Sequence, residues 1–285
     1  MSAAPTPKPT LQLKALSVGE LLDYATKLYK DNFLVFFTIA GLAEVISFAS
    51  LPLLSLVTGT TPSAAGGEIL FAFLSLFVWW LAFLIMTVLS QAATTFAVAD
   101  CYFERPITAL QSYRRAGRFL GRLIRLGIEV GLRIGFATLA LVVPGILLTL
   151  KYSVAVPVAV LEDKPTNEAI ARSSELTKGE YKRIFPIYVL FWVLGFIFSS
   201  AVQYLAAVGA VVQFLGPVWL EAASLIGRFI VGTMIQPLLT ISLSLLYFDL
   251  RVRKEGFDLQ MMLQQISEQS PVTTPVSLPP VSPTH

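Results

Sequence analysis

Long apolar stretches alternate with short polar segments along this chain. No charged residue occurs over 31 positions from Ile69 to Ala99, or over 37 positions from Ile184 to Leu220. A further uncharged stretch covers the 20 residues from Phe229 to Phe248. A helix needs about 20 apolar residues to cross the hydrocarbon core of a bilayer. The pattern therefore predicts an all-α protein, a polytopic transmembrane helical bundle.

The turn-forming residues between the apolar stretches predict about six spans. They cover residues 33–57, 69–100, 127–143, 145–161, 184–210 and 217–248. Together they make one membrane domain over residues 17–262, with a flexible tail before it at 1–16 and a disordered Pro-, Ser- and Thr-rich tail after it at 263–285. The stretch 127–161 is broken at Pro144-Gly145 and leaves two alternatives, a hairpin of two short spans or one span followed by a re-entrant segment.

The polar segments beside the spans carry helical signals of their own. Ser17 and Glu20 fit a capping box ahead of apolar residues at helical spacing, which predicts an amphipathic helix at the membrane surface. A second helix is expected from Pro106 to about Arg125. At 100° per residue it places four arginines within about 80° of one another: Arg114, Arg118, Arg122 and Arg125. This face is a candidate contact for anionic lipid headgroups or for a partner, and the alternative interpretation is a solvated interfacial helix.

Composition agrees with a membrane protein, and the placement of charge adds an orientation. Hydrophobic residues make up 55% of the chain and charged residues only 14%. The basic excess lies in four segments (before the first span, 104–125, 162–183 and after the last span), whereas the predicted loops 58–67 and 209–216 hold no Lys or Arg. Because short basic loops stay in the cytoplasm, we expect both termini there. An even number of membrane crossings must then separate segment 104–125 from segment 162–183, which favours the hairpin. The membrane orientation also accounts for the basic net charge, so no nucleic-acid partner is expected.

Ionisable residues inside the predicted spans are the candidate functional positions, since charge in a bilayer is costly. They are Glu44, Glu129, Arg133, Lys151, Glu221 and Arg228. Glu129 and Arg133 are four residues apart and share a helix face, as do Glu221 and Arg228 at a spacing of seven. Glu44 and Lys151 are the most costly, and we expect them to pair unless Glu44 is protonated. The set forms either a polar track for a substrate, ion or headgroup, or structural pairs.

Small residues predict a site of close helix packing. Gly127, Gly131 and Gly135 recur every four residues and leave a smooth stripe on one helix face. The partner helix belongs either to this chain or to another.

Residues suited to catalysis or metal binding are scarce. The chain has one cysteine, Cys101, and its single histidine is His285. It contains none of the motifs of zinc proteases, serine hydrolases or phosphate-binding loops. The sequence therefore predicts a non-enzymatic protein without a metal or cofactor.

Several motifs, taken in order, resemble the membrane-domain family of glycerophosphoryl diester phosphodiesterase, a family of prokaryotic multi-pass proteins. They are Ser17-Val18-Gly19-Glu20-Leu21-Leu22-Asp23, Pro144-Gly145-Ile146 with Lys151-Tyr152, Val160-Leu161-Glu162, Arg172-Ser173-Ser174, Leu176-Thr177-Lys178-Gly179, and Tyr247 with Asp249-Leu250-Arg251-Val252-Arg253-Lys254-Glu255-Gly256. The resemblance covers about 17–262. Since the chain has no pair of histidines for phosphodiester hydrolysis, the resemblance implies a stand-alone membrane domain of unassigned activity in the inner membrane of a prokaryotic cell.

Two functional hypotheses follow. The first is a membrane scaffold or accessory subunit whose basic helices engage anionic lipid headgroups, a partner membrane protein or a second copy of the chain. The second is a small transporter or lipid-handling protein that uses Glu44, Lys151 and Arg228. The second hypothesis requires a cavity that reaches the middle of the membrane.

Overall fold

The computed structural model describes residues 17–45, 67–103, 105–212 and 216–256, and every regular element in these ranges is a helix. The helices are α1 (Val18–Asp31), an unlabelled helix (Phe33–Val45), α3 (Gly67–Tyr102), α4 (Ala109–Arg118), α5 (Leu120–Ala140), α6 (Val142–Lys151), α7 (Ala155–Leu161), α8 (Thr166–Thr177), α9 (Tyr181–Val212) and α10 (Pro217–Glu255). The predicted all-α class is confirmed. The predicted tails 1–16 and 263–285 and residues 46–57 of the first predicted span lie outside the described residues.

Among the residues that the structure describes, four helical stretches are long and apolar enough to cross a bilayer. They are Phe73–Tyr102, Val142–Leu161, Tyr181–Gly209 and Ala222–Glu255, and the helix Phe33–Val45 is apolar but shorter. Helix α5 is not among them, since it carries charged residues along most of its length. The chain is thus a helical membrane protein, and the total of six spans stays a prediction.

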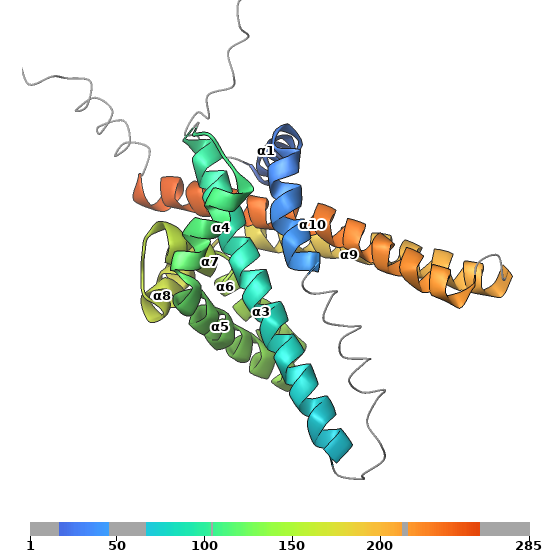
Figure 1. Cartoon of the computed structure of the whole chain (residues 1–285). Coiled ribbons are helices and arrows are strands. Elements are labelled where there is room, and N and C mark those ends of the chain that lie inside the picture. Colours follow the sequence, from blue (N-terminus) through green and yellow to red (C-terminus); the bar gives the residue numbers. More distant parts are fainter. Residues whose placement is uncertain (1–16, 46–66, 104, 213–215, 257–285) are drawn as a thin grey trace, which may run out of the picture.

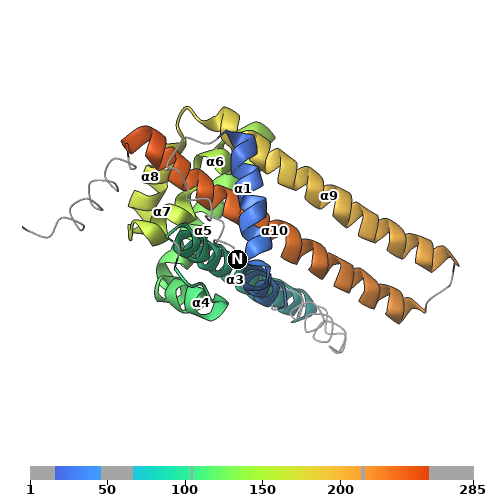
Figure 2. The same ribbon diagram turned by 90° about the horizontal axis from the view of Figure 1, so that it is seen from above.

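One end of the bundle gathers the charged helix ends, and we call it the basic end. Arg115 of α4 binds Asp100 near the end of α3 through contacts of 2.9 and 2.7 Å. Arg183 at the start of α9 binds Asp249 near the end of α10 at 2.8 Å. Beyond this end the helices separate: α9 and α10 project side by side, whereas α3 diverges from them (Figures 1 and 2).

Helices α5 to α7 leave the basic end and return to it. Arg122, in the first turn of α5, binds Asp163, just after α7, at 2.6 Å. The chain between them turns at Leu141, and α5 and α6 pack against each other. The break therefore precedes Pro144, the third residue of α6. Proline is tolerated in the first turn of a helix because its missing N–H has no partner there.

The predicted helix from Pro106 to Arg125 is instead two helices, which corrects the expected arginine face. Thr108 caps α4 by accepting a hydrogen bond from the Gln111 amide at 3.4 Å, and α4 ends at Arg118. Phe119 leaves the helical conformation before α5 begins. The four arginines therefore lie on two helices, Arg114 and Arg118 on α4 and Arg122 and Arg125 on α5.

Other helix ends follow local signals in the sequence. The expected capping box begins α1, because the Ser17 amide donates to the Glu20 carboxylate at 2.7 Å and the Glu20 amide donates to the Ser17 hydroxyl at 3.3 Å. Helix α8 has Pro165 at its N-cap, and Thr166 is its first helical residue. The chain reverses after α8 at Gly179, whose φ of +87° suits glycine.

A network of ion pairs joins α7, α8 and α10 at the basic end. Arg172 of α8 contacts Glu255 and, at 3.4 Å, Glu162. Arg251 binds Glu255 at 3.0 Å, and the Tyr247 hydroxyl donates to Glu162 at 3.0 Å. Because each charged group meets several partners that are themselves held in helices, the network fixes the angle between these helices better than isolated surface pairs do.

A partly buried tyrosine attaches α4 to the helix Phe33–Val45. The Tyr113 hydroxyl donates to the Ile39 carbonyl oxygen at 2.6 Å. Burial raises the pKa of Tyr113 to about 12, although a side-chain hydrogen bond with Ser90 acts in the opposite direction. Tyr113 therefore stays neutral and keeps donating at any physiological pH.

Only part of the glycine stripe on α5 packs closely. A Cβ at Gly127 would lie 2.8 Å from Val88 Cγ2 of α3, so α3 is the close partner there. A Cβ at Gly131 or Gly135 would meet nothing within 4 Å. Among the described residues of this chain, the expected tight packing is therefore found at Gly127 and not at Gly131 or Gly135, and packing of these two against another chain stays a prediction.

Asp249→Asn should destabilise the protein, because Asp249 is buried and accepts from both Arg183 and Arg253. Hydrogen bonds between charged groups are worth about 1.5–3 kcal/mol. We expect a lower midpoint of thermal unfolding in detergent. Glu175→Gln is the control, since Glu175 is an exposed partner of Arg172 and exposed pairs contribute about 0–1 kcal/mol. Equal midpoints for the two variants would contradict this.

Gly127→Ala and Gly131→Ala should shift the unfolding midpoint in opposite directions. Alanine gains up to about 1 kcal/mol over glycine inside a helix. At Gly131 this gain is unopposed, whereas at Gly127 the methyl group meets Val88 and overpacking costs about 1–3 kcal/mol. Thermal unfolding in one detergent compares the two variants. A midpoint raised equally by both would show that α3 and α5 do not touch at Gly127.

Candidate functional site

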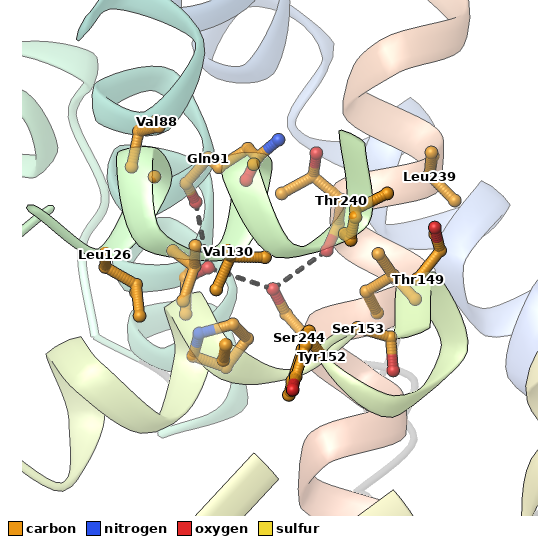
Figure 3. A pocket seen from close by; sticks show the side chains of 18 of the residues that line it. Val88, Gln91, Leu126, Val130, Thr149, Tyr152, Ser153, Leu239, Thr240 and Ser244 are labelled. Carbon is orange, nitrogen blue, oxygen red and sulfur yellow. Dashed lines mark hydrogen bonds between the residues drawn. The ribbon is translucent and has the colours of Figure 1, made fainter. Parts of the chain in front are cut away.

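A cavity of about 290 Å³ lies among α3, α5, the α6–α7 turn and α10, and we call it the polar cavity. Uncharged polar side chains from α3, α6, the α6–α7 turn (152–154) and α10 line it together with apolar ones (Figure 3): Gln91, Thr95, Thr149, Ser153, Gln236, Thr240 and Ser244. Gly131 also lines it, which explains the empty space beside this glycine. The centre of the bundle thus offers polar atoms within otherwise apolar helices.

Most hydroxyl groups of the polar cavity donate their protons to their own helices. Thr95 donates to the Gln91 carbonyl at 2.8 Å, and Ser244 to the Thr240 carbonyl at 2.8 Å. Thr149 donates to the Gly145 carbonyl at 2.9 Å. Each hydroxyl oxygen keeps lone pairs for a further donor. These groups therefore suit a ligand rich in N–H or O–H donors, or water.

Two polar features stand out among the residues that line this cavity. The hydroxyl oxygens of Thr95 on α3 and Ser244 on α10 approach within 3.2 Å. In the α6–α7 turn, the buried hydroxyl oxygen of Ser153 has no hydrogen-bond partner among the described residues. A buried polar atom without a partner costs about 1–3 kcal/mol. Ser153 is thus the group that gains most from a polar ligand in the cavity.

A groove of about 400 Å³ adjoins the polar cavity, and we call it the charged groove. Its wall includes Glu44 of the helix Phe33–Val45 and Arg228 of α10. Tyr188, Gln236 and Leu239 line both the groove and the cavity, so the two spaces are neighbours. Trp192 also lines the groove and is 71% exposed, so the groove opens sideways on the apolar outer surface of the bundle.

The structure separates the expected partners Glu44 and Lys151. Glu44 lies against α10, where a Cβ at Gly232 would approach its Oε1 within 2.5 Å. Lys151 ends α6, and its carbonyl oxygen accepts hydrogen bonds from Ser173 and Thr177 of α8 at 3.1 and 3.0 Å. No ion pair between Glu44 and Lys151 occurs within the described ranges. The expected pair is wrong because the short helix α6 returns Lys151 to the basic end.

The other predicted charges have different surroundings. Glu129 and Arg133 form an ion pair on α5 at 2.5 Å. The side chain of Glu221 lies outside the described residues, so its expected shared face with Arg228 is untested. Of the four predicted arginines, Arg122 is engaged by Asp163, whereas Arg114, Arg118 and Arg125 are exposed.

The polar residues of the cavity were missed by the sequence analysis, which considered only charged groups. A signal for them exists, because Gln91 and Thr95 on α3 are four residues apart, and Gln236, Thr240 and Ser244 repeat that spacing on α10. Such spacing places uncharged polar groups on one face of an apolar helix. It does not reveal that the two faces meet.

Residues from four of the motifs that resemble the family meet at the basic end, whereas Tyr152 of a fifth motif lines the polar cavity. Glu162, Arg172, Tyr247 and Glu255 belong to the ion-pair network, and Ser173 and Thr177 hold the end of α6. These motifs therefore maintain the arrangement of the helices. The candidate binding groups come from other positions.

Comparison with known proteins supports the resemblance over part of the chain. No curated protein and no solved structure matches this sequence. The family model described as the membrane domain of glycerophosphoryl diester phosphodiesterase matches residues 125–252. The match covers most of α5, all of α6 to α9 and α10 as far as Val252, and in this region the chain is similar to that membrane domain.

Proposed function

We propose that this chain is a lipid-handling membrane protein that takes the polar part of an amphiphile into the polar cavity. The observation that carries the proposal is the cavity itself, in which polar groups from α3, the α6–α7 turn and α10 face one another inside a membrane bundle. Polar groups in such a setting are costly without a partner. A cavity of this kind is also what the second functional hypothesis required.

The side opening supports a lipid rather than a water-soluble solute. The charged groove borders the cavity and opens among exposed apolar side chains of α9, including Trp192 and Phe196. A lipid can keep its acyl chains in the bilayer while its headgroup enters from the side. The proposed role is binding and movement of a lipid rather than its chemical conversion.

The proposal includes an orientation in the inner membrane of a prokaryotic cell, with the basic end and both termini in the cytoplasm. The segments rich in Lys and Arg, 104–125 and 162–183, meet at the basic end through the pair of Arg122 and Asp163. Short basic segments are retained on the cytoplasmic side. This supports the orientation expected from the sequence.

A second proposed role, engagement of anionic lipid headgroups at the basic end, rests on α4 and α5. Arg114, Arg118 and Arg125 are exposed there, and no ion pair to them occurs within the described ranges. Clustered exposed arginines are attracted to anionic headgroups. This role retains the scaffold hypothesis in a narrower form, without Arg122.

Filling the polar cavity should remove bound lipid. Gly131→Leu places a side chain in the empty space of the cavity wall, and Gly135→Leu makes the same change one turn further along α5, where the residue does not line the cavity. We expect native mass spectrometry of detergent-purified protein to show copurified lipid on wild type and Gly135→Leu, and several-fold less on Gly131→Leu. Equal lipid on the two variants would refute the proposed role of the cavity.

Neutralising the exposed arginines of α4 should weaken binding of anionic lipid specifically. The double variant Arg114→Gln/Arg118→Gln removes two exposed charges, and Lys178→Gln/Lys182→Gln removes two exposed charges near α8 as a control. We expect a several-fold loss of retained phosphatidylglycerol only in the arginine variant, since a basic residue near an anionic surface contributes about 1 kcal/mol. If both variants retain equal amounts, the α4 arginines have no special role.

A further inference from the structure

We infer that the charged groove is a headgroup site for a phospholipid that carries a primary ammonium group beside its phosphate, such as phosphatidylethanolamine. Glu44 binds the ammonium and Arg228 the phosphate. This inference rests on the proposed lipid-handling function and names the lipid class. It is supported by the positions of Glu44 and Arg228 in the charged groove and by their opposite charges.

Along the axis of α10, the Glu44 carboxylate and the backbone of Arg228 lie about one helical turn apart. Both residues line the charged groove, and the Glu44 carboxylate lies against Gly232, one helical turn after Arg228 on the same face of α10. One turn corresponds to about 5–6 Å along the axis. In a phosphoethanolamine headgroup two carbons and one ester oxygen separate nitrogen from phosphorus, so its opposite charges span a similar distance.

The two charged groups are not neutralised by neighbours that the structure describes. No hydrogen bond or ion pair to the Glu44 carboxylate or to the Arg228 guanidinium occurs within the described ranges. Both residues belong to apolar helices, where an uncompensated charge costs several kcal/mol. A zwitterionic headgroup supplies one opposite charge to each of them and adds no net charge to the membrane.

The groove favours this headgroup over two common alternatives. An anionic glycerol headgroup would satisfy Arg228 but has no positive charge to offer to the Glu44 carboxylate. A choline headgroup carries the right charges but has no N–H, so it cannot donate to the carboxylate. Gly232 keeps the carboxylate accessible, since a methyl group at this position would collide with it.

The neighbouring polar cavity provides further acceptors for the ammonium. Gln236 lines both spaces, and Thr240 follows it by one turn on α10 with its hydroxyl proton already donated to the Gln236 carbonyl at 3.2 Å. The route inward from Glu44 therefore passes oxygen atoms that accept from N–H groups. Among the described residues that line the cavity, none is charged, so nothing there repels the ammonium.

Headgroup selectivity of the wild-type protein is the first test. The protein is reconstituted in nanodiscs of equal parts phosphatidylethanolamine, phosphatidylcholine and phosphatidylglycerol with identical acyl chains, and retained lipid is counted by native mass spectrometry. We expect retention of the ethanolamine lipid to exceed that of either other lipid by about tenfold, as one charge-assisted hydrogen bond provides. Equal retention of the ethanolamine and choline lipids, or preference for the glycerol lipid, would overturn the inference.

Substitutions of the two residues then test which part of the headgroup each of them binds. Glu44→Gln should abolish the preference for ethanolamine over choline, and Arg228→Gln should lower retention of all three lipids while Arg228→Lys restores it. Glu129→Gln is the matched control, because it makes the same change in the pair with Arg133 on α5. An unchanged preference in Glu44→Gln would overturn the inference.

The selectivity of the wild-type protein tests the headgroup site even if a variant does not fold. Different results would reject the headgroup site and the lipid-handling role of the polar cavity. Loss of lipid in Gly131→Leu together with unselective retention in wild type would reject the headgroup site and keep the lipid-handling role. Equal lipid on wild type, Gly131→Leu and Gly135→Leu would reject the role of the polar cavity.

Discussion

The arrangement of this protein depends on the ion pairs that fasten its helix ends at one end of the bundle. Glu162, Arg172, Arg251 and Glu255 connect α7, α8 and α10, while Asp249 connects α10 to the start of α9. Inside a bilayer apolar helices gain little by burying apolar surface against each other, because lipid chains are equally apolar. Polar contacts at the basic end therefore determine which helices are neighbours, and they leave the other ends free to diverge.

The divergence of α3 from the pair of α9 and α10 creates the conditions for a binding site. The helices cross where Thr95 approaches Ser244, and beyond this point α3 no longer covers α10 (Figure 1). The polar cavity lies at the crossing, and the charged groove lies beside it, bordered by the helix Phe33–Val45. A bundle packed evenly along its length would have neither space. The proposed function therefore depends on a bundle whose helices are joined at the basic end and diverge beyond it.

Short helices position the residues that line the polar cavity. Helix α6 is too short to carry Lys151 away from the basic end, and the turn that follows it directs Ser153 into the polar cavity. Helix α8 holds this turn through two hydroxyl groups that donate to the Lys151 carbonyl. Most residues of the motifs that resemble the family thus act indirectly, since they hold the wall of the polar cavity in place, and Tyr152 is itself part of that wall.

The sequence by itself determined the helical class, the membrane location, the capping box of α1 and the convergence of basic segments, because each depends on local composition or short spacing. It also identified Glu44 and Arg228 as costly charges. Only the tertiary structure decided that Glu44 lies against Gly232 and lines one groove with Arg228, while Lys151 lies elsewhere. The polar cavity was likewise invisible in the sequence. Its groups come from helices far apart in the chain, and helical spacing defines a face of one helix but does not specify which other face it meets.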